Sequence, residues 1–300
     1  MSDRSKGVYV DSLSHLLATL SVSANVFHNG QYCGNWAIDT SGSHYISFHA
    51  VSYGRCFVKM EGKDDVHTLS AGDVVLFPSD AKHVLTSDNA FSQTINTEQS
   101  IGFEQLEPNG TGLVCGYFEH HHPMINDIIR HLPEMIIVTK HQQSDAPLSL
   151  LTESLLVISK QQGDGIELML ERLSECILAA LLRDHLPLEQ GILAAMANPK
   201  LAPAIQAIFA NPEQKWTVEQ LADRCFSSRT SFATLFKQTL GKSPVEFATE
   251  WRLGLAYRAL ADDGVSTLAA ALSCGYESEA SFSKAFKRTF SITPGQVRSK

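Results

Sequence analysis

Two stretches in the last third of the chain decide its fold: Ser278-Glu-Ala-Ser-Phe-Ser-Lys-Ala-Phe-Lys-Arg-Thr-Phe290 and, fifty residues earlier, Ser228-Arg-Thr-Ser-Phe-Ala-Thr-Leu-Phe-Lys-Gln-Thr-Leu240. Identical residues occupy corresponding places in and just after the two copies: Ser228/Ser278, Ser231/Ser281, Phe232/Phe282, Phe236/Phe286, Lys237/Lys287, Thr239/Thr289 and Pro244/Pro294. An internal repeat at a fixed offset indicates one structural unit built twice. The C-terminal part of the chain is therefore predicted to contain two copies of one helical unit.

Capping residues define the helices of each copy. Thr217 and Ser266 precede the first helix of each unit, and a second serine (Ser227 or Ser228 in the first copy) precedes the second helix. Such side chains accept a hydrogen bond from the free N–H groups of the first helical turn. A short helix, a tight turn and a second capped helix form a helix-turn-helix. The helix predicted over Pro244–Leu260 joins the two units.

The residue types of the second helices suit DNA reading. Phe232 and Phe236 form an apolar face, and short polar side chains occupy the N-terminal half of each helix. Lys237, Lys287 and Arg288 lie where they can meet the DNA backbone. Two recognition helices would fit successive major grooves roughly 34 Å apart. The alternative is a purely structural helical pair, but the doubled spacing favours double-stranded DNA as the partner.

Composition is that of a globular protein of about two domains. The chain has 300 residues, of which 44% are hydrophobic and 19% charged. No apolar run approaches the roughly 20 residues of a membrane span, and Met1–Gly7 is unlike a signal peptide, so a cytoplasmic protein is expected. Residues 211–300 carry a net charge of +3, whereas the remaining 210 residues carry −11. A mildly basic tail on an acidic body is compatible with nucleic-acid binding.

The N-terminal half is predicted to be mainly β. Short apolar runs at spacings of about ten residues indicate a small antiparallel sandwich or barrel. The predicted strands are Tyr45–Tyr53, Cys56–Met60, Val66–Leu69, Asp73–Phe77, His83–Thr86 and Leu113–Phe118. A short helix is expected over residues 8–20, before these strands.

Beyond Pro123 the hydrophobic period becomes helical. Helices are expected over Met124–Leu132, Leu148–Lys160 and Ile166–Leu186, followed by a linker over Pro187–Lys200. The apolar stripe of the third helix suits either the core of its own domain or a dimer surface, and favours the core. The fold class is therefore α+β multidomain: a sensor domain over 1–122, a helical connector and dimerisation region over 123–200, and a DNA-binding domain over 201–300.

The C-terminal part resembles the DNA-binding domain of AraC-type bacterial transcription regulators. The resemblance covers Trp216–Val297 and includes Leu235-Phe236-Lys237, Trp251-Arg252-Leu253 and Phe282-Ser283-Lys284-Ala285-Phe286. It implies base-reading positions at Thr230, Ala233, Thr234, Glu279, Ser281, Ser283 and Lys284. Arg229 is added from its helical position. Departures from the family pattern are Phe226 in the first turn and Ser291 in place of a glycine.

The N-terminal half resembles the cupin-like sensor domain of one branch of these regulators. The stretch Gly72–His83 follows the second cupin motif, with Gly, Pro and His in register. The first motif is absent: no His-x-His precedes Tyr53-Gly54, and His49 stands where that motif usually has Glu. Since metalloenzyme cupins take most of their metal ligands from the first motif, an enzyme is not expected.

Three hypotheses remain for the role of the histidines and cysteines of the barrel. His49, His83 and His44 would suit a divalent metal such as Zn, Ni or Fe as a cofactor. Alternatively these are core histidines satisfied by hydrogen bonds. A third reading is redox sensing through Cys33 or Cys115, which requires an exposed thiol of low pKa. The run His120-His121-His122 is read as a solvated turn.

The sequence thus predicts a DNA-binding transcription regulator whose barrel senses a small molecule, a metal or an oxidant. A homodimer and contact with RNA polymerase are compatible with this reading. One alternative is a cupin-type metalloenzyme fused to a DNA-binding domain. Another is a binding protein whose barrel serves only oligomerisation.

Overall fold

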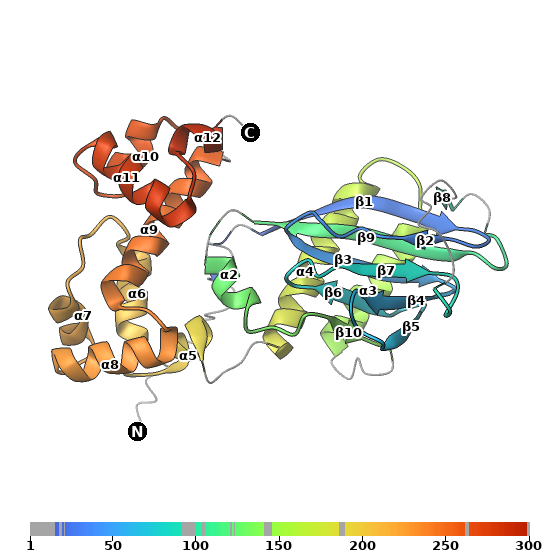
Figure 1. Cartoon of the computed structure of the whole chain (residues 1–300), viewed down its shortest axis with the longest axis horizontal. Helices are drawn as coiled ribbons and strands as arrows, with labels where there is room; N and C mark the ends of the chain where they lie inside the picture. The colour runs from blue at the N-terminus through green and yellow to red at the C-terminus, as the bar shows by residue number, and fades with distance from the viewer. Residues whose placement is uncertain are drawn as a thin grey trace, which may run out of the picture. The chain divides into compact units, whose positions relative to one another are not determined.

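The computed structural model describes residues 16–17, 20, 22–91, 100–103, 106–120, 122, 124–140, 146–185, 190–261 and 264–298. The described chain falls into two compact units (Figure 1). One unit contains Val22–His120 and Ile129–His185, and the other contains His121–Ile128 and Leu186–Lys300. The helix expected over residues 8–20 lies almost wholly outside the described residues.

The first unit is built on two antiparallel sheets. In the described part of the chain, one sheet has six strands in the order β10-β6-β3-β9-β1-β8, and the other has four in the order β2-β7-β4-β5. The strands are β1 (Ser23–Tyr32), β2 (Ala37–Ile38), β3 (Ile46–Tyr53), β4 (Arg55–Met60), β5 (Val66–Ser70), β6 (Val74–Phe77), β7 (His83–Thr86), β8 (Ser100–Ile101), β9 (Thr111–Glu119) and β10 (Ile136–Val138). All six predicted strands are confirmed, whereas β1, β2, β8 and β10 were not expected.

Strand β3 is buried on both faces, which explains its almost continuous apolar sequence. Side chains alternate along a strand, so Phe48 and Ala50 face the helices of this unit while Val51 faces the space between the two sheets. His49 shares the inward parity of Val51 and pairs in register with Cys115 of β9. This inward face forms the core of the sensor.

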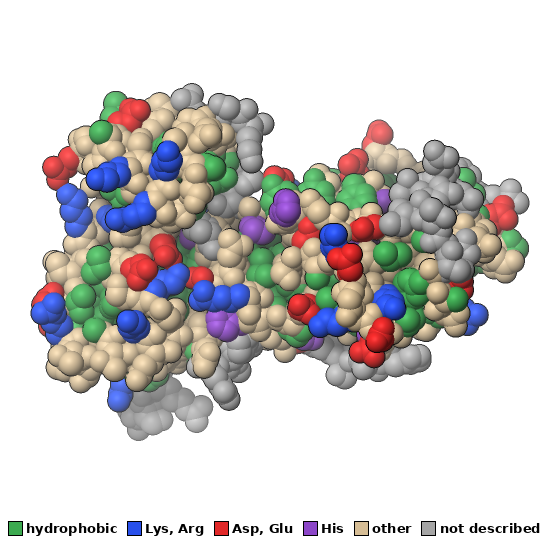
Figure 2. All heavy atoms as spheres, viewed as in Figure 1, with side chains coloured by type: hydrophobic (Ala, Val, Ile, Leu, Met, Phe, Trp, Pro, Cys, Tyr) green, Lys and Arg blue, Asp and Glu red, His purple; other side chains and the backbone are tan. Residues whose placement is uncertain are grey.

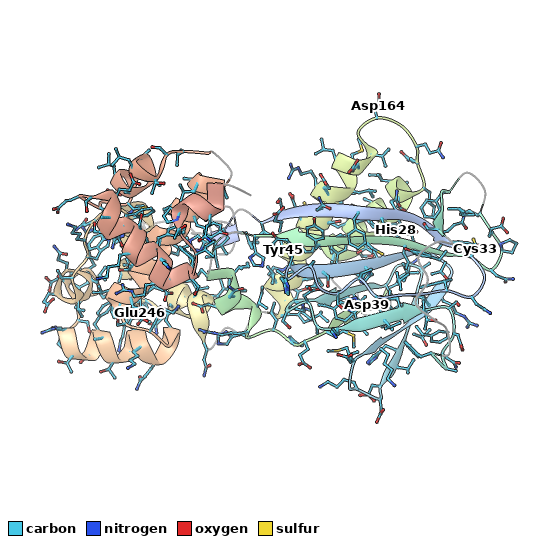
Figure 3. All side chains as sticks on the ribbon, turned by 45° about the horizontal axis from the view of Figure 1, so that its top comes forward. His28, Cys33, Asp39, Tyr45, Asp164 and Glu246 are labelled. Carbon is cyan, nitrogen blue, oxygen red and sulfur yellow. The ribbon has the colours of Figure 1, made fainter. Side chains whose placement is uncertain are left out.

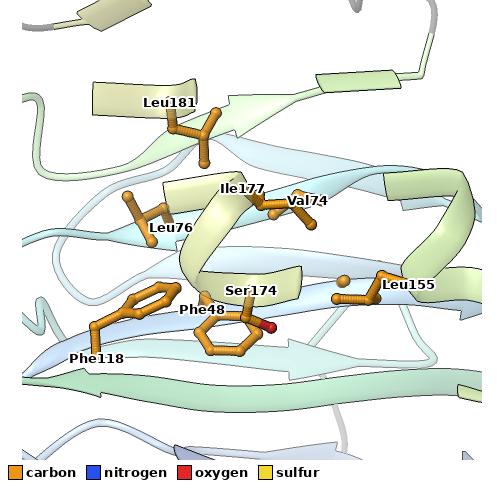
Figure 4. A pocket seen from close by; sticks show the side chains of 9 residues that line it. Phe48, Val74, Leu76, Phe118, Leu155, Ser174, Ile177 and Leu181 are labelled. Atoms are coloured by element: carbon orange, nitrogen blue, oxygen red, sulfur yellow. The ribbon is translucent and has the colours of Figure 1, made fainter. Parts of the chain in front are cut away.

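Helices α3 (Ala146–Ser159) and α4 (Ile166–His185) cover the other face of the six-stranded sheet. Leu155 of α3 and Ser174, Ile177 and Leu181 of α4 meet the sheet around a cavity of about 10 Å³ (Figure 4). That volume holds at most a single water molecule. The helix stripe is therefore domain core, as predicted, except that Met169 is half exposed.

The second unit is helical. Its elements are α2 (Met124–Ile129, whose last residue groups with the first unit), α5 (Gly191–Ala197), α6 (Ala202–Ala210), α7 (Val218–Arg224), α8 (Arg229–Leu240), α9 (Pro244–Ala261), α10 (Thr267–Ser273), α11 (Glu279–Phe290) and α12 (Pro294–Arg298). Helices α7 and α8 form one helix-turn-helix, α10 and α11 form the other, and α9 joins them (Figure 1). The helices predicted for the two helix-turn-helix units, and the helix that joins them, are confirmed.

The linker expected over Pro187–Lys200 was wrong for residues 191–197. Residues 191–197 form α5, which packs against α6 and α8. Ile192, Ala194, Ala195 and Met196 are buried there. The reason is that a short apolar helix gains more free energy by covering the helix-turn-helix than by remaining in water.

His122 is buried, so the solvated turn expected for it was wrong. Its ring packs 5.0 Å from the Trp251 ring of α9, and its Nε2 lies 3.3 Å from the Trp251 carbonyl oxygen. Its Nδ1 accepts a hydrogen bond from the Met124 N–H at 3.2 Å. A Cβ atom on Gly254 would lie 2.3 Å from His122 Nε2, so this position of α9 has room only for glycine.

Lys242 adds an ion pair to the same packing. Its ammonium group contacts the Asp127 carboxylate of α2 and the Glu250 carboxylate of α9. The Lys242 side chain is only 13% exposed, and the two carboxylates keep its pKa raised against the opposing effect of burial. Together, His122 and this ion pair hold residues 122–128 on α9.

In the described part of the chain, no single helix is long and apolar enough to cross a membrane. Helices α5 and α6 meet that criterion only jointly, as a pair bent by 108°. Their buried residues lie in the interior of the helical unit.

The burial of His122 makes stability depend on pH. Burial lowers the pKa of His122 from 6.5 to about 4. Between these values the unfolded chain binds a proton that the native ring does not, so stability is full above pH 6.5 and falls toward pH 4. We expect His122→Asn, which keeps an acceptor for the Met124 N–H, to reduce the pH slope of the unfolding free energy by up to about 1.4 kcal/mol per pH unit. Urea unfolding at pH 4.5–7 measures this, and equal slopes would contradict it.

Candidate nucleic-acid interface and sensor site

The two second helices begin and end in the same way. Ser228 accepts a hydrogen bond from the Ser231 N–H, and Ser278 accepts one from the Ser281 N–H, each at 3.3 Å. At their C-termini, Gly241 and Ser291 both adopt the left-handed conformation, with φ of 75° and 62°. Ser291 therefore ends α11 in the conformation that a glycine would adopt more easily, and its backbone is strained because it carries a Cβ atom.

Paired phenylalanines fix the orientation of these helices. The rings of Phe232 and Phe236 lie 5.5 Å apart, and those of Phe282 and Phe286 lie 5.4 Å apart. All four are buried. Helix α9 contacts both pairs, because Phe247 meets Phe236 and Tyr257 meets Phe286. Burial of one face leaves the opposite face of each helix turned outward.

The outward faces carry the residues predicted to read DNA. Nine of these side chains are exposed: Arg229, Thr230, Thr234, Lys237, Glu279, Ser281, Lys284, Lys287 and Arg288. Ala233 and Ser283, which correspond to each other at an offset of fifty, are half-buried. Figure 2 shows Lys and Arg side chains on the surface of the helical unit. The structure thus gathers the predicted residues of each helix on one accessible face.

Two of these side chains already have partners in the protein. The Arg229 guanidinium lies 2.8 Å from Glu219 of α7. The Ser281 hydroxyl donates to the Ser278 carbonyl oxygen at 2.9 Å. Contact of either group with DNA would require exchange of an existing bond, which lowers the net gain in free energy.

Sequence reasoning missed a contact that joins the two helix-turn-helix units. Lys215, before α7, forms an ion pair with Glu277 in the second turn at 2.7 Å. A Cβ atom on Gly275 would lie 2.2 Å from the Glu213 carbonyl oxygen. The exposed ion pair adds little stability, so the close backbone approach at Gly275 is the stronger constraint. No local sequence signal pairs residues sixty apart.

A compact polar group lies inside the sensor. His49 Nε2 and His83 Nε2 are 3.0 Å apart, and Thr40 Oγ1 lies 3.1 and 3.2 Å from them, respectively. His83 Nδ1 lies 2.7 Å from the Ala81 carbonyl oxygen, so it carries the proton and leaves Nε2 with a free lone pair. Burial lowers the pKa of both histidines, which keeps their rings neutral and able to act as ligands.

His28 is a partly buried imidazole of the same unit that sequence reasoning missed. It lies on β1 (Figure 3), and its ring stacks 4.7 Å from Tyr32. Burial lowers the pKa of His28 to about 4. Its Nε2 and the Nδ1 of His49 are buried without a hydrogen-bond partner in the described structure. Strand β1 has no clear alternating pattern, so no sequence signal singled out His28.

His44 does not join this group. It is exposed, and its N–H donates to Asp80 at 2.7 Å. Among the residues that the structure describes, no three His, Cys, Asp or Glu side chains are arranged to hold a metal ion. The structure brings together only His49 and His83 of the three predicted ligands.

The two candidate redox thiols have raised pKa values. Cys33, at the end of β1 (Figure 3), is partly exposed, and burial and then the charge of Glu107 raise the pKa of its thiol. Cys115 is fully buried, which raises its pKa well above the ordinary value. Reactive thiolates need the opposite shift. The raised pKa values of these two thiols therefore disfavour redox sensing at either position.

A surface groove of about 340 Å³ borders the His83 site. Its walls include Asp39, Lys59, Lys82 and Phe91 together with His83. This volume is within the range of small-molecule sites. Both charge signs line the groove, so it suits a small polar molecule.

The fold and the paired reading helices define the class of protein: a two-domain, DNA-binding regulator. Residues 11–187 match the family model described as Cupin, and residues 221–300 match the model described as Helix-turn-helix domain. The chain belongs to the AraC-type transcriptional regulators with an N-terminal cupin domain.

Similar proteins span the whole chain. An uncharacterized HTH-type transcriptional regulator of Haemophilus influenzae is 30% identical over 301 residues, covering 97% of this chain and 98% of the relative. A putative AraC-like transcription regulator of Streptomyces lividans is 29% identical over 305 residues, covering 96% and 98%. The DNA-binding domain of AdpA, solved in complex with a target DNA, is 27% identical and covers 34% of this chain and 92% of that chain, with a TM-score of 0.32.

The serine caps should contribute measurably to the stability of the reading helices. We expect Ser228→Ala and Ser278→Ala each to lower the unfolding free energy by about 1 kcal/mol, because each leaves an N–H of the first turn unpaired. The matched variants Ser228→Asn and Ser278→Asn keep an acceptor and should stay within a few tenths of a kcal/mol of wild type. Urea unfolding measures all four, and equal losses for alanine and asparagine would contradict the capping role.

Proposed function

We propose that α8 and α11 read two adjacent DNA half-sites through the residues on their outward faces. The observation that carries this proposal is that both helices share one construction: a serine cap, a buried phenylalanine pair and a polar N-terminal half. N-terminal residues of a recognition helix contact base edges in the major groove. A single chain would then read a bipartite site.

The base contacts differ in chemistry between the two helices. In α8, Thr230 and Thr234 offer hydroxyls, while Ala233 offers only an apolar contact such as one to a thymine methyl. In α11, Glu279 can accept from a cytosine amino group and Lys284 can donate to guanine. Ser281 and Ser283 add hydroxyls on the same helix. The downstream half-site would therefore be read mostly by charged and polar groups.

Lys237, Lys287 and Arg288 are assigned to the phosphate backbone. They are exposed in the C-terminal halves of their helices, and contacts of this kind position the protein without reading sequence. Arg229 would contact the bases or the DNA backbone only after its ion pair with Glu219 is broken. RNA polymerase and a second copy of the chain are the protein partners we infer; exposed apolar residues on α3 and α4, such as Leu150 and Leu168, support the latter.

Loss of Lys284 should relax sequence recognition. We expect Lys284→Ala to weaken binding to a selected duplex by about 1–3 kcal/mol if the ammonium contacts a base. As the matched control, Lys287→Ala should weaken selected and random duplexes alike and should reduce the salt slope by about one. Electrophoretic mobility shifts at several salt concentrations separate the two, and identical behaviour of both variants would refute the assignment.

For the barrel, we infer that the His49–His83–Thr40 group is the point at which the effector is sensed. A divalent ion would use the two Nε2 lone pairs and the Thr40 hydroxyl, and borderline ions such as Zn²⁺ and Ni²⁺ favour imidazole. A small polar molecule would instead enter the groove beside His83. Among the described residues, no third His, Cys, Asp or Glu joins His49 and His83 in a group that could hold a metal ion, which supports sensing over cupin-type metal catalysis. Residues 122–128 would transmit the effect of effector binding to α9, because they follow β9 directly in the chain.

Metal binding can be tested on the purified full-length protein. We expect dialysed wild type and His44→Ala to bind about one Zn²⁺ per chain, because His49 and His83 can both ligate the ion. His49→Phe and His83→Phe should bind none, with circular dichroism confirming their fold. Elemental analysis after exposure to Zn²⁺ is the measurement, paired with thiol titration before and after mild oxidant. Equal zinc in all four proteins would exclude the site, and oxidant-dependent loss of the Cys33 thiol with altered DNA binding would favour the redox alternative.

A further inference from the structure

Phe226 occupies the turn between α7 and the reading helix α8. It follows Cys225, the last capping residue of α7, and its N–H donates to the Asp223 carbonyl oxygen at 3.1 Å. The next N–H, that of Ser227, donates to the Ala222 carbonyl oxygen at 3.0 Å. Ser228 then caps α8. Phe226 is thus held by a fully hydrogen-bonded turn, two residues before the reading helix is capped.

Its conformation is strained. The φ of Phe226 is 48°, in the left-handed region that a bulky side chain rarely adopts. For a residue with a Cβ atom this region is unfavourable because the Cβ atom approaches the carbonyl oxygen. Glycine would fit the same turn without that strain.

The second helix-turn-helix shows the relaxed solution. There Cys274 is the corresponding cap of α10, and the next residue is Gly275 with φ of 70°. Glycine is required at that position because a Cβ atom would lie 2.2 Å from the Glu213 carbonyl oxygen. The two turns therefore share one left-handed residue, which is glycine in one copy and phenylalanine in the other.

Exposure adds a second cost at Phe226. Its side chain is 100% exposed, more than any other large hydrophobic residue in the described structure. An aromatic ring of this size contributes stability only when it leaves water. A strained backbone that also presents an unburied ring contributes nothing to folding, and strain of this kind is found where function requires it.

We propose that Phe226 is a DNA contact that packs against apolar groups at the edge of the major groove read by α8. The inference rests on the proposed reading role of α8, whose exposed N-terminal residues include Thr230 and Thr234. Phe226 is itself exposed and precedes the cap of that helix, Ser228, by two residues. When the start of that helix enters the groove, a side chain two residues before the cap meets the groove wall. Thymine methyl groups and deoxyribose carbons are the apolar surfaces available there.

The contact would belong to one half-site only. At the corresponding position of the second unit, Gly275 has no side chain that could contact DNA, and the backbone of Glu213 packs against it. Recognition at the α8 half-site would therefore include an apolar contribution that recognition at the α11 half-site lacks. The competing hypothesis is that the Phe226 ring contacts a protein partner such as RNA polymerase.

Opposite effects on stability and on DNA binding test the proposal. The experiment uses the full-length protein and a duplex selected by wild type from a random-sequence library. Phe226→Gly should raise the urea midpoint, because glycine removes the strain, while its affinity for the duplex should fall about tenfold or more through loss of the buried ring. Phe226→Leu keeps an apolar side chain and should retain most of the affinity without the gain in stability.

The outcomes are separable. Unchanged affinity of Phe226→Gly, with Lys284→Ala impaired, would overturn the role of Phe226 and leave the proposed reading helices intact. Unchanged affinity of both variants would overturn the proposed reading as well. Unchanged affinity of Phe226→Gly with reduced transcription in a reporter assay would assign the ring to a protein partner and refute the DNA contact.

Discussion

Burial of two phenylalanines one turn apart is the interaction on which the DNA-reading half depends. Phe232 with Phe236, and Phe282 with Phe286, fix the rotation of α8 and α11 about their axes. Because residues three and four positions apart share a helix face, fixing the apolar face also fixes which side chains are offered to DNA. Replacement of these rings would alter the reading surface without touching any residue on it.

The sensor depends on a related constraint, a sheet covered on both faces. Strand β3 sends alternate residues toward α4 and toward the four-stranded sheet, so His49 is carried into the interior with Val51. Burial penalises the charged ring, lowers its pKa and leaves a neutral imidazole beside His83. The same burial raises the pKa of the Cys115 thiol. One environment therefore keeps the histidines neutral and disfavours the thiolate form of this cysteine.

The two helix-turn-helix units are similar but not equal. Their first helices are related by 49 residues, from Thr217 to Ser266, whereas their reading helices are related by 50, from Ser228 to Ser278. The second turn is therefore one residue longer, and its Gly275 is packed against the backbone before α7. The left-handed residue of the turn is thus an exposed phenylalanine in the first unit and a glycine packed against the Glu213 backbone in the second.

The repeat, the helix caps and the buried phenylalanine rings could all be predicted from the sequence, because they depend on contacts within a few residues. The spacing of about ten residues between short apolar runs also predicted six strands of the N-terminal unit. The contacts between distant groups depend on the packing of the whole fold: Thr40 with His49 and His83, His122 with α9, and Glu213 with Gly275. Strand β1 and helix α5 escaped prediction because partners far along the chain, rather than local pattern, stabilise them. Local periodicity specifies elements, whereas the convergence of side chains depends on how those elements pack.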